Sequence, residues 1–371
     1  MPQHRICRRL AVQVAACIVA ASTAAAALAQ RAETVASGLD HPWAVAFLPE
    51  GRFLVTERPG RMRVVEANGR VGQPLGGVPE VVARGQGGLL DVVLDSGFAQ
   101  NRTLFFCYSE PGDGGNGTAL ARARLADDQR RLEEVRVIFS ARPKFASNAH
   151  FGCRIVEARD GNLFLGLGER FRRMQDAQTL DNHHGKMVRI RKDGSVPPDN
   201  PFVGRAGALP EIWSHGHRNP QGATLAPDGT VWMHEHGPQG GDEINLPRPG
   251  RNYGWPVITY GENYGGGRIG DGLTGRAGME QPLHYWVPSI APSGMAFLTS
   301  DRYGAAMKGN LFIGSLKFGY LARLELADGK VAREHKLLEG IGRVRDVRQG
   351  PDGWLYLLTD ESSGKLVRVR P

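Results

Sequence analysis

The chain has 371 residues, including 46 Lys and Arg, 38 Asp and Glu and 50 Gly, and 41% of its residues are hydrophobic. This much apolar material excludes a mainly disordered chain, and the lack of a G-X-Y period excludes collagen. The formal charge of +8 is mild and evenly spread, so we expect no nucleic-acid partner.

The first 29 residues resemble a secretory signal peptide. Arg5, Arg8 and Arg9 precede an apolar, Ala-rich stretch that ends in Ala27-Leu28-Ala29. This order of basic, apolar and small residues predicts cleavage near Ala29 and a periplasmic or secreted mature protein. A twin-arginine signal at Arg8-Arg9 and a lipoprotein cleavage box at Cys17 remain as alternatives. No later segment reaches about 18 apolar residues, so we expect no membrane span.

One short sequence pattern recurs along the rest of the chain, which we take as a single domain over 30–371. It is a turn, often Asp-Gly, followed by a short run of large apolar residues, which is typical of a β-strand. Its copies lie at 49–57, 101–106, 159–165, 227–233, 308–313 and 351–357. Repeats of this size predict an all-β fold, a six-bladed β-propeller with long top-face loops.

Two segments differ from this repeated pattern. The widest interval, Gly229 to Gly309, predicts a long insertion. Residues 129–137 form the one helix-like stretch, and they fit a hairpin edge equally well.

Cysteine and histidine were considered as reactive or metal-binding groups. Cys7 and Cys17 fall in the signal, so Cys107 and Cys153 remain, and the sequence leaves open whether they pair. Seven of the eleven histidines lie between His150 and His236. The pairs His215/His217 and His234/His236 have a spacing that suits zinc or copper, but we favour hydrogen-bonded loop histidines.

Two further groups of residues suggest ligands. Loops rich in Gly and Pro carry Asp242, Glu243 and Glu262, and such carbonyl and carboxylate oxygens suit Ca²⁺. Four cations in polar, glycine-containing loops would favour a small polyanion if they converge, because guanidinium groups pair with carboxylates. Ordinary surface cations are the alternative interpretation of these residues, which are Arg218, Lys317, Arg343 and Arg345.

An ordered series of motifs resembles the soluble pyrroloquinoline quinone (PQQ)-dependent glucose/sorbosone dehydrogenases, closest to their aldose sugar dehydrogenase branch. The likeness runs from Gly38-Leu39-Asp40-His41-Pro42-Trp43 to Thr359-Asp360-Glu361-Ser362. The motifs between these ends include Ala149-His150-Phe151-Gly152, Gly166-Leu167-Gly168-Glu169, Arg218-Asn219-Pro220-Gln221-Gly222, Glu235-His236-Gly237-Pro238, Gly241-Asp242-Glu243-Ile244-Asn245 and Asn252-Tyr253-Gly254-Trp255-Pro256.

The resemblance implies a six-bladed propeller that uses PQQ and Ca²⁺ to oxidise aldose sugars at C1 to lactones. It implies His150 as the general base and Arg218 as a second catalytic group. The cofactor-binding residues it implies are Gln86, Arg218, Asn219, Lys317, Arg343 and Arg345. The metal ligands it implies are Gly237 and Pro238 for one calcium, Glu243 and Tyr253 for a second, and, more loosely, Tyr260 and Glu262.

The sequence departs from the family pattern beside the base. The glucose dehydrogenase branch carries an acid at the position of Ala149, so another group must orient His150. The short loops over 265–272 suggest a wide mouth and loose sugar selectivity.

The chain has no CxxCH haem motif, so we expect a separate electron acceptor, which is a quinone, a cytochrome or a dye. Two alternatives remain. A calcium-dependent sugar lactonase would not need the cation cluster, and a non-catalytic ligand-binding propeller would not need His150 with Arg218 and Asn219.

Overall fold

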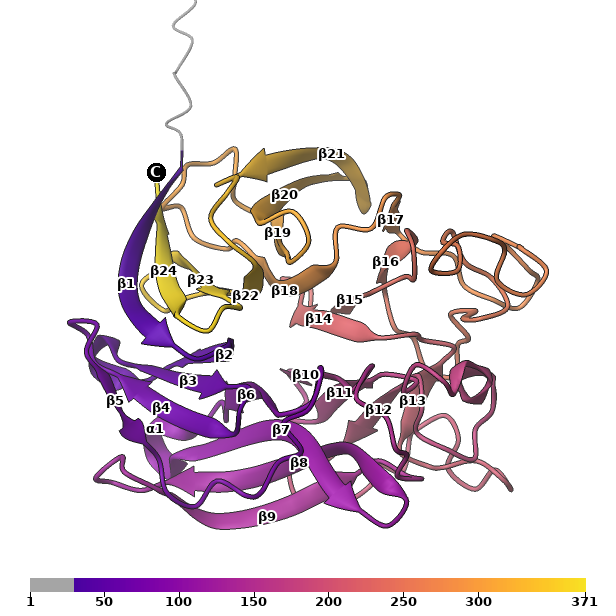
Figure 1. Cartoon of the computed structure of the whole chain (residues 1–371), viewed down its shortest axis with the longest axis horizontal. Helices are drawn as coiled ribbons and strands as arrows, with labels where there is room; N and C mark the ends of the chain where they lie inside the picture. Colours follow the sequence, from indigo (N-terminus) through magenta and orange to yellow (C-terminus); the bar gives the residue numbers. More distant parts are fainter. Residues whose placement is uncertain (1–29) are drawn as a thin grey trace, which may run out of the picture.

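The computed structural model describes residues 30–371, which form six four-stranded antiparallel sheets around one axis (Figure 1). The predicted six-bladed β-propeller is therefore confirmed. The predicted signal peptide, with Cys7 and Cys17, lies outside the described residues.

Each blade runs outward from the axis in chain order. Blade 1 consists of β2 (Pro42–Phe47), β3 (Phe53–Glu57), β4 (Arg61–Val65) and β5 (Val71–Pro74). Blade 2 consists of β6 (Leu89–Leu94), β7 (Thr103–Gly112), β8 (Gly115–Leu125) and β9 (Leu132–Ser140). Blade 3 consists of β10 (Gly152–Glu157), β11 (Leu163–Leu167), β12 (Lys186–Ile190) and β13 (Ile212–His215). Blades 4 and 5 consist of β14 (Pro220–Leu225), β15 (Val231–Glu235), β16 (Asp242–Asn245) and β17 (His284–Trp286); and β18 (Pro292–Phe297), β19 (Leu311–Ser315), β20 (Tyr320–Ala327) and β21 (Lys330–Leu337).

Blade 6 joins the two ends of the described chain. Its strands β22 (Val344–Gln349), β23 (Leu355–Thr359) and β24 (Gly364–Arg370) come last in the sequence, and β1 (Arg31–Leu39) comes first. β1 pairs with β24 from Arg31 opposite Arg370 to Leu39 opposite Gly364. These hydrogen bonds close the ring of blades and cover an edge of β24 that would otherwise be open.

The recurring sequence pattern occupies the same position in each blade. Each of its six copies contains the turn after a first strand and the second strand of a blade, namely β3, β7, β11, β15, β19 and β23. Residues 129–137 form a turn and the start of β9, so the hairpin interpretation is correct. Helix in residues 30–371 is confined to three short turns, η1 (Pro49–Gly51), α1 (Phe98–Asn101) and η2 (Met174–Gln178).

The first strands β2, β6, β10, β14, β18 and β22 pack against one another in a closed ring around the axis. In all six blades the pairing of the first and second strands shifts register near the start of the first strand. Such bulges bend a strand and redirect its side chains, and they are common beside functional sites. The entrances to the first strands are therefore irregular in every blade.

A buried ion network occupies the axis inside this ring. Nη1 of Arg154 on β10 lies 2.8 Å from Oδ1 of Asp346 on β22 and 3.3 Å from Oδ1 of Asp91 on β6. Arg348 bonds both aspartates from the other side, at 2.6 Å to Asp91 and 3.0 Å to Asp346. Arg154 Nε also donates to the carbonyl of Gln221 on β14. The network thus ties together first strands that are far apart in the sequence.

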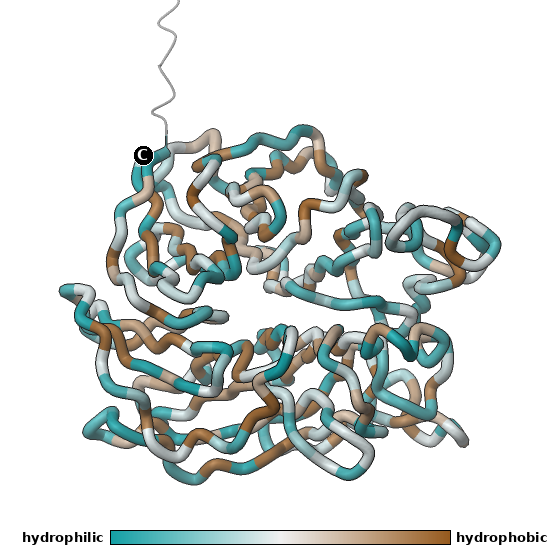
Figure 2. The backbone as a smooth tube through the Cα atoms, in the orientation of Figure 1, coloured by the Kyte–Doolittle hydropathy of each residue, from teal (hydrophilic) through white to brown (hydrophobic). Residues whose placement is uncertain are grey.

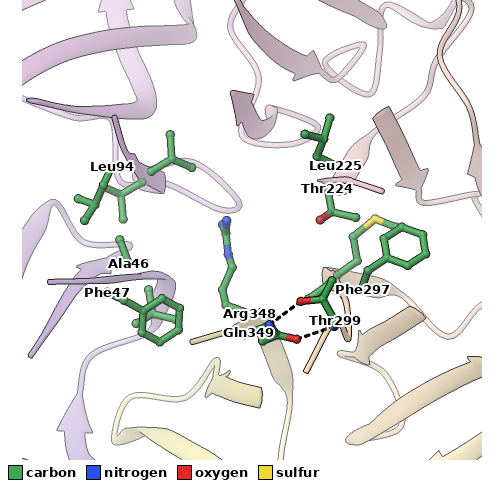
Figure 3. A pocket seen from close by; sticks show the side chains of 14 residues that line it. Ala46, Phe47, Leu94, Thr224, Leu225, Phe297, Thr299, Arg348 and Gln349 are labelled. Carbon is green, nitrogen blue, oxygen red and sulfur yellow. Dashed lines mark hydrogen bonds between the residues drawn. The ribbon is translucent and has the colours of Figure 1, made fainter. Parts of the chain in front are cut away.

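The network separates two openings on the axis. Figure 3 shows the one beside the C-terminal ends of the first strands, a pocket of about 390 Å³ lined by apolar side chains such as Phe47, Leu94 and Phe297. Its central cation, Arg348, is already paired with Asp91 and Asp346. The candidate site residues that the sequence predicted lie instead at the N-terminal ends of these strands.

The predicted insertion lies between β16, which ends at Asn245, and β17, which begins at His284. It projects from the ring at the right of Figure 1 and is mostly polar in Figure 2, whereas the blade strands carry most of the apolar residues. Within 30–371, no helix is long and apolar enough to cross a membrane.

Replacing Arg154 by Met should strongly destabilise the protein. The change leaves Asp91 and Asp346 buried with one cation fewer, and breaking a buried ion pair costs roughly 3–5 kcal/mol. Urea unfolding of this variant measures the loss. The matched change Arg131→Met removes an exposed ion pair and should cost less than about 1 kcal/mol. Equal losses in the two variants would contradict the importance of the axial network.

A candidate active site at the entrance of the first strands

A cavity of about 420 Å³ opens on the axis where the first strands begin. The backbone there turns through left-handed conformations in the segments that lead into the strands, at His41, Gly85, His150, Gly216, Ala291 and Gly342. Its lining includes side chains from all six blades, among them Trp43, Gln86, Phe151, Asn219, Lys317 and Arg345. The fold thus gathers residues that the sequence scatters over about 300 positions, as propeller entrances commonly do.

His150 lies between this cavity and a neighbouring groove, because Phe151 lines the cavity and Ala149 lines the groove. Its Nδ1 is 3.1 Å from Oε1 of Glu169, and both side chains are buried. Burial lowers the pKa of His150 below its ordinary value, the nearby Arg218 and Arg170 lower it further, and Glu169 opposes them. The imidazole is therefore neutral at pH 7, and Nδ1 is the ring nitrogen that faces Glu169.

Glu169 is the group that orients His150 in place of the acid absent at Ala149. The hairpin of β10 and β11 pairs Gly152 with Leu167, so continuing the pairing two residues toward the entrance places His150 opposite Glu169. Glu169 stands in a motif that resembles the family, but the sequence alone predicted no role for it. Counting back from the Asp160-Gly161 turn in the regular register of Ile155 with Leu165 would place His150 opposite Arg170, and the bulge at Cys153 shifts the pairing by one residue to Glu169.

Arg218 is held rigidly at the entrance of β14. Its Nη1 donates to the carbonyls of His236 and Gly237, at 3.0 and 2.6 Å, and its backbone N–H donates to the Glu235 carboxylate. Glu235 in turn bonds His217 at 2.9 Å. The guanidinium is therefore fixed by groups from the same blade, and its buried Nε has no partner within residues 30–371.

Asn219 and Gln86 link neighbouring entrances. Oδ1 of Asn219 accepts from the backbone N–H of Gly152 at 3.2 Å, and Oε1 of Gln86 accepts from that of His150 at 2.9 Å. Both residues line the cavity, and their predicted contact with a cofactor stays a prediction.

Three of the four predicted cations, Lys317, Arg343 and Arg345, line this cavity, whereas Arg218 lines the small cavity that contains Glu235. Lys317 and Arg343 are exposed, whereas Arg345 is buried and donates to Asp360 at 2.8 Å. Burial alone would raise the pKa of Asp360, but the charge and hydrogen bond of Arg345 bring it below its ordinary value. The sequence analysis missed Arg58, a further cation in the lining, and Asp360.

Aromatic rings surround the site. Trp43 and Phe151 line the cavity, and the guanidinium carbons of Arg154 and Arg345 lie 4.1 and 5.7 Å from the Trp43 ring. Two exposed rings stand at the mouth. Phe171 meets the His150 ring edge-on at 5.2 Å, and Tyr264, 6.4 Å from Phe171, approaches Arg218 through its hydroxyl at 3.4 Å. Sequence analysis identified neither ring.

The predicted metal ligands fall into an inner and an outer set. Gly237, Pro238, Glu243 and Tyr253 lie inward, with Glu243, Gly237 and Tyr253 around one small cavity shared with Glu235. The Tyr253 hydroxyl donates to the carbonyl of Leu246, so its side chain is already engaged. The outer set consists of half-buried Tyr260, which stacks on Tyr285 and donates to Gln281, and exposed Glu262, whose backbone pairs with Gln239.

The buried carboxylates carry unbalanced negative charge. Burial raises the pKa of Glu243 well above its ordinary value, and the neighbouring Glu235 and Asp242 add to this effect. One ring of each His-X-His pair is hydrogen-bonded. His217 bonds Ser214 and Glu235, and His236 bonds the Pro292 carbonyl at 2.6 Å. Within 30–371, the buried Nδ1 of His215 and both ring nitrogens of His234 have no hydrogen-bond partner, so the hydrogen-bonded interpretation holds for one histidine of each pair.

Known proteins of similar sequence and structure share this architecture. The glucose/sorbosone dehydrogenase family profile matches residues 39–368. The chain is 48% identical over 345 residues to aldose sugar dehydrogenase YliI of Escherichia coli, covering 91% of this chain and 92% of the relative.

Solved structures agree with this match. The apo-form of the E. coli aldose sugar dehydrogenase superposes with a TM-score of 0.89 at 46% identity, covering 92% of this chain and 99% of the other. The PQQ-bound form of an aldose sugar dehydrogenase from Streptomyces coelicolor has a TM-score of 0.75 at 29% identity, covering 92% and 98%.

The Glu169→Gln change should lower the pKa of His150 further. Glu169 is the group that raises this pKa against burial, so removing its charge leaves only effects that favour the neutral ring. A titration followed by NMR of the His150 ring nitrogens measures the shift. His335, which pairs with Glu325 away from the site, is an internal control whose titration should not move. A His150 pKa that rises or stays the same would contradict the pairing.

Proposed function

Because the chain belongs to the glucose/sorbosone dehydrogenase family, we propose that it oxidises aldose sugars at C1 to lactones, with PQQ and Ca²⁺ as cofactors. The chain is accordingly an oxidoreductase of the sugar dehydrogenase type. The observation that carries the finer proposal is the buried pair of His150 and Glu169 beside a cavity that three cations line.

The residues present fit PQQ, which carries three carboxylates. Lys317, Arg343 and Arg345 supply positive charge on one side of the cavity, and Arg345 Nε is buried without a partner within residues 30–371. Guanidinium groups bind carboxylates through paired hydrogen bonds, and Trp43 and Phe151 supply apolar surface for a flat ring system. A sugar lactonase would have no use for this cation cluster.

When bound, PQQ supplies the two-electron acceptor for the hydride that leaves the sugar C1. The chain's own residues manage the proton. His150 Nε2 takes it from the C1 hydroxyl, and Glu169 stabilises the imidazolium that results. Arg218 presents a fixed positive charge beside the reacting atoms, because its carbonyl partners and Glu235 prevent it from turning away.

Phe171 and Tyr264 suit a sugar at the mouth. Both rings are exposed, and they flank the approach to His150 and Arg218. Aromatic rings in binding sites offer a rigid apolar surface at low entropic cost. An aldose that stacks on either ring would lie beside His150 and Arg218.

The calcium proposal rests on two electrostatic features. The carbonyls of His236 and Gly237 already converge on the Arg218 cation. Glu243 and Glu235 lie buried together, and a divalent cation would offset the repulsion that raises the pKa of Glu243. Gly237, Pro238, Glu243 and Tyr253 are the residues that would hold Ca²⁺, with Tyr260 and Glu262 nearby in the sequence.

We further propose that the chain is exported and passes its electrons to a separate quinone, cytochrome or dye. The disulfide between Cys107 and Cys153 supports export, because such bonds persist in oxidising compartments.

The His150→Gln variant should lose about 10²- to 10⁴-fold in kcat, the usual cost of removing a general base. It should still bind PQQ, because the cation cluster is untouched. Dye-linked oxidation of an aldose, measured with and without added PQQ and Ca²⁺, tests the reaction, and fluorescence titration tests cofactor binding. Full turnover in this variant, or PQQ-independent oxidation by the wild type, would contradict the proposal.

Added Ca²⁺ should raise the melting temperature of the metal-free protein. At 100 times the dissociation constant the stabilisation is about 2.7 kcal/mol. Glu243→Gln should lose most of this rise, whereas Glu50→Gln, at an exposed site, should keep it. Calorimetry of EDTA-treated protein with Ca²⁺ or Mg²⁺ provides the measurement. An equal rise in both variants would remove Glu243 from the proposed site.

A further inference from the structure

The segment that carries His150 has an unusual backbone. His150, Gly152 and Cys153 all have left-handed conformations, with φ of 51°, 68° and 87°. Glycine is required at 152, because a Cβ there would lie 2.6 Å from the carbonyl oxygen of Gly166. His150 and Cys153 have a Cβ and are disfavoured in this region, so the surrounding structure must hold them there.

Hydrogen bonds fix the first three residues of the segment. The His150 and Gly152 N–H groups donate to Gln86 and Asn219, as described above, and the Phe151 carbonyl accepts from Thr118 Oγ1 at 2.7 Å. Cys153 differs from them. The pairing of β10 with β11 passes from Gly152 to Arg154 and skips Cys153, which is the bulged residue.

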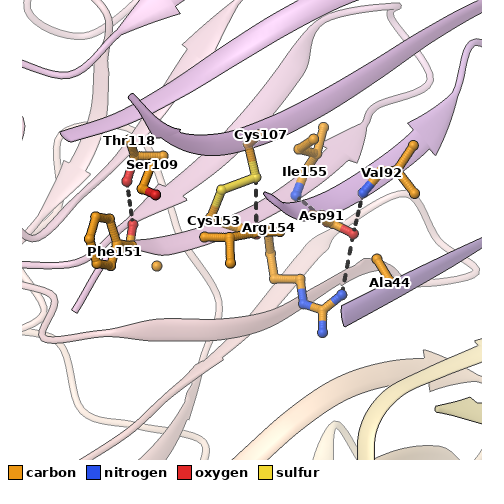
Figure 4. Close-up of a disulfide and its surroundings, with 12 residues drawn as sticks. Ala44, Asp91, Val92, Cys107, Ser109, Thr118, Phe151, Cys153, Arg154 and Ile155 are labelled. Carbon is orange, nitrogen blue, oxygen red and sulfur yellow. Dashed lines mark hydrogen bonds and ion pairs between the residues drawn. A yellow bond between two sulfur atoms is a disulfide. The ribbon is translucent and has the colours of Figure 1, made fainter. Parts of the chain in front are cut away.

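Cys153 has no partner in the strand pairing, but a disulfide fixes its position. It joins Cys153 to Cys107 inside β7 of the neighbouring blade, with 6.1 Å between the two Cα atoms (Figure 4). β7 pairs with β6 on one side and with β8 on the other, so Cys107 is a rigid anchor. Both cysteines are fully buried. The only cross-link in residues 30–371 therefore lies three residues from the proposed general base.

We propose that the Cys107–Cys153 disulfide positions His150, by holding Cys153 in its left-handed bulge, and that turnover depends on the redox state of this pair. The inference rests on the proposed function of His150. Reduction by a dithiol breaks the S–S bond, adds two electrons and two protons, and yields two thiols and the oxidised dithiol. Without the bond, Cys153 relaxes toward ordinary backbone angles and His150 moves relative to Glu169 and Arg218.

Three proteins separate positioning from general stabilisation. Cys107→Ala removes the cross-link but leaves a Cβ at position 153. The double variant Cys107→Ala/Cys153→Gly also lacks the cross-link, but glycine adopts φ of 87° without a steric penalty. The wild type is the third protein, assayed as purified, after reduction with dithiothreitol and after reoxidation, with free thiols counted each time.

Cys107→Ala should lose up to about 100-fold in kcat, the effect of misplacing a catalytic group by about 1 Å. The acid limb of its kcat/KM profile should shift, because His150 changes its distance to Glu169. The double variant should recover kcat to within about threefold of the wild type, and PQQ affinity should stay constant, because the cation cluster is untouched. Reduced wild type should behave as Cys107→Ala does, and reoxidation should restore it.

Several outcomes would overturn this inference. If Cys107→Ala only melts at a lower temperature and keeps its kcat and pH profile, the disulfide is merely structural. A loss that the double variant does not recover would exclude the backbone of Cys153 as the cause. If Cys107→Ala does not fold, an unchanged kcat in reduced wild type overturns the proposal by itself. Failure of the proposed function is distinct, because oxidised wild type would then lack PQQ-dependent aldose oxidation.

Discussion

Two aspartates and an arginine buried on the propeller axis hold the ring of first strands together. Arg154 from blade 3 bonds Asp91 from blade 2 and Asp346 from blade 6. Asp346 also accepts from the Val45 N–H of blade 1, and Arg154 donates to the Gln221 carbonyl of blade 4. In blade 5, Gly294 leaves room for the network, since a Cβ there would lie 2.4 Å from Asp346. Charges buried at this depth are tolerated only when all are paired, so the blades are constrained to one arrangement.

The axial network lies next to the candidate cavity, and the distribution of charges around it determines the sign of the electrostatic potential there. Arg154 Nη2 donates to the carbonyl of Arg345, which is the residue that connects the axial network to the cavity above it. Below the network, Arg348 is neutralised by two carboxylates. Above it, Arg58, Lys317, Arg343 and Arg345 face the cavity with Asp360 as the carboxylate in the lining. The excess positive charge therefore lies at one end only, where it would attract an anionic ligand.

The sequence predicted the blades well, because the turn and second strand of each blade form a local pattern. It also supplied the cavity residues, from His150 to Arg345, through motifs whose order resembles one family. It did not reveal Glu169, because the bulge at Cys153 shifts the hairpin register by one residue. It did not reveal Arg154 as an axial group, because its partners lie 63 and about 190 residues away. The pairing of Cys107 with Cys153 stayed open for the same reason, since only folding brings β7 beside the entrance of β10.

The residues of the candidate site also maintain the fold. A bulge at each entrance removes backbone groups from the strand pairing, and buried N–H groups must find other partners. Gln86 from blade 2 accepts from the N–H of His150 in blade 3, and Asn219 from blade 4 accepts from the N–H of Gly152. The amide side chains that line the cavity thus satisfy the backbone of the neighbouring blade. Replacing either one changes the position of the His150 segment as well as the cavity wall, so its effects on binding and on turnover are physically coupled.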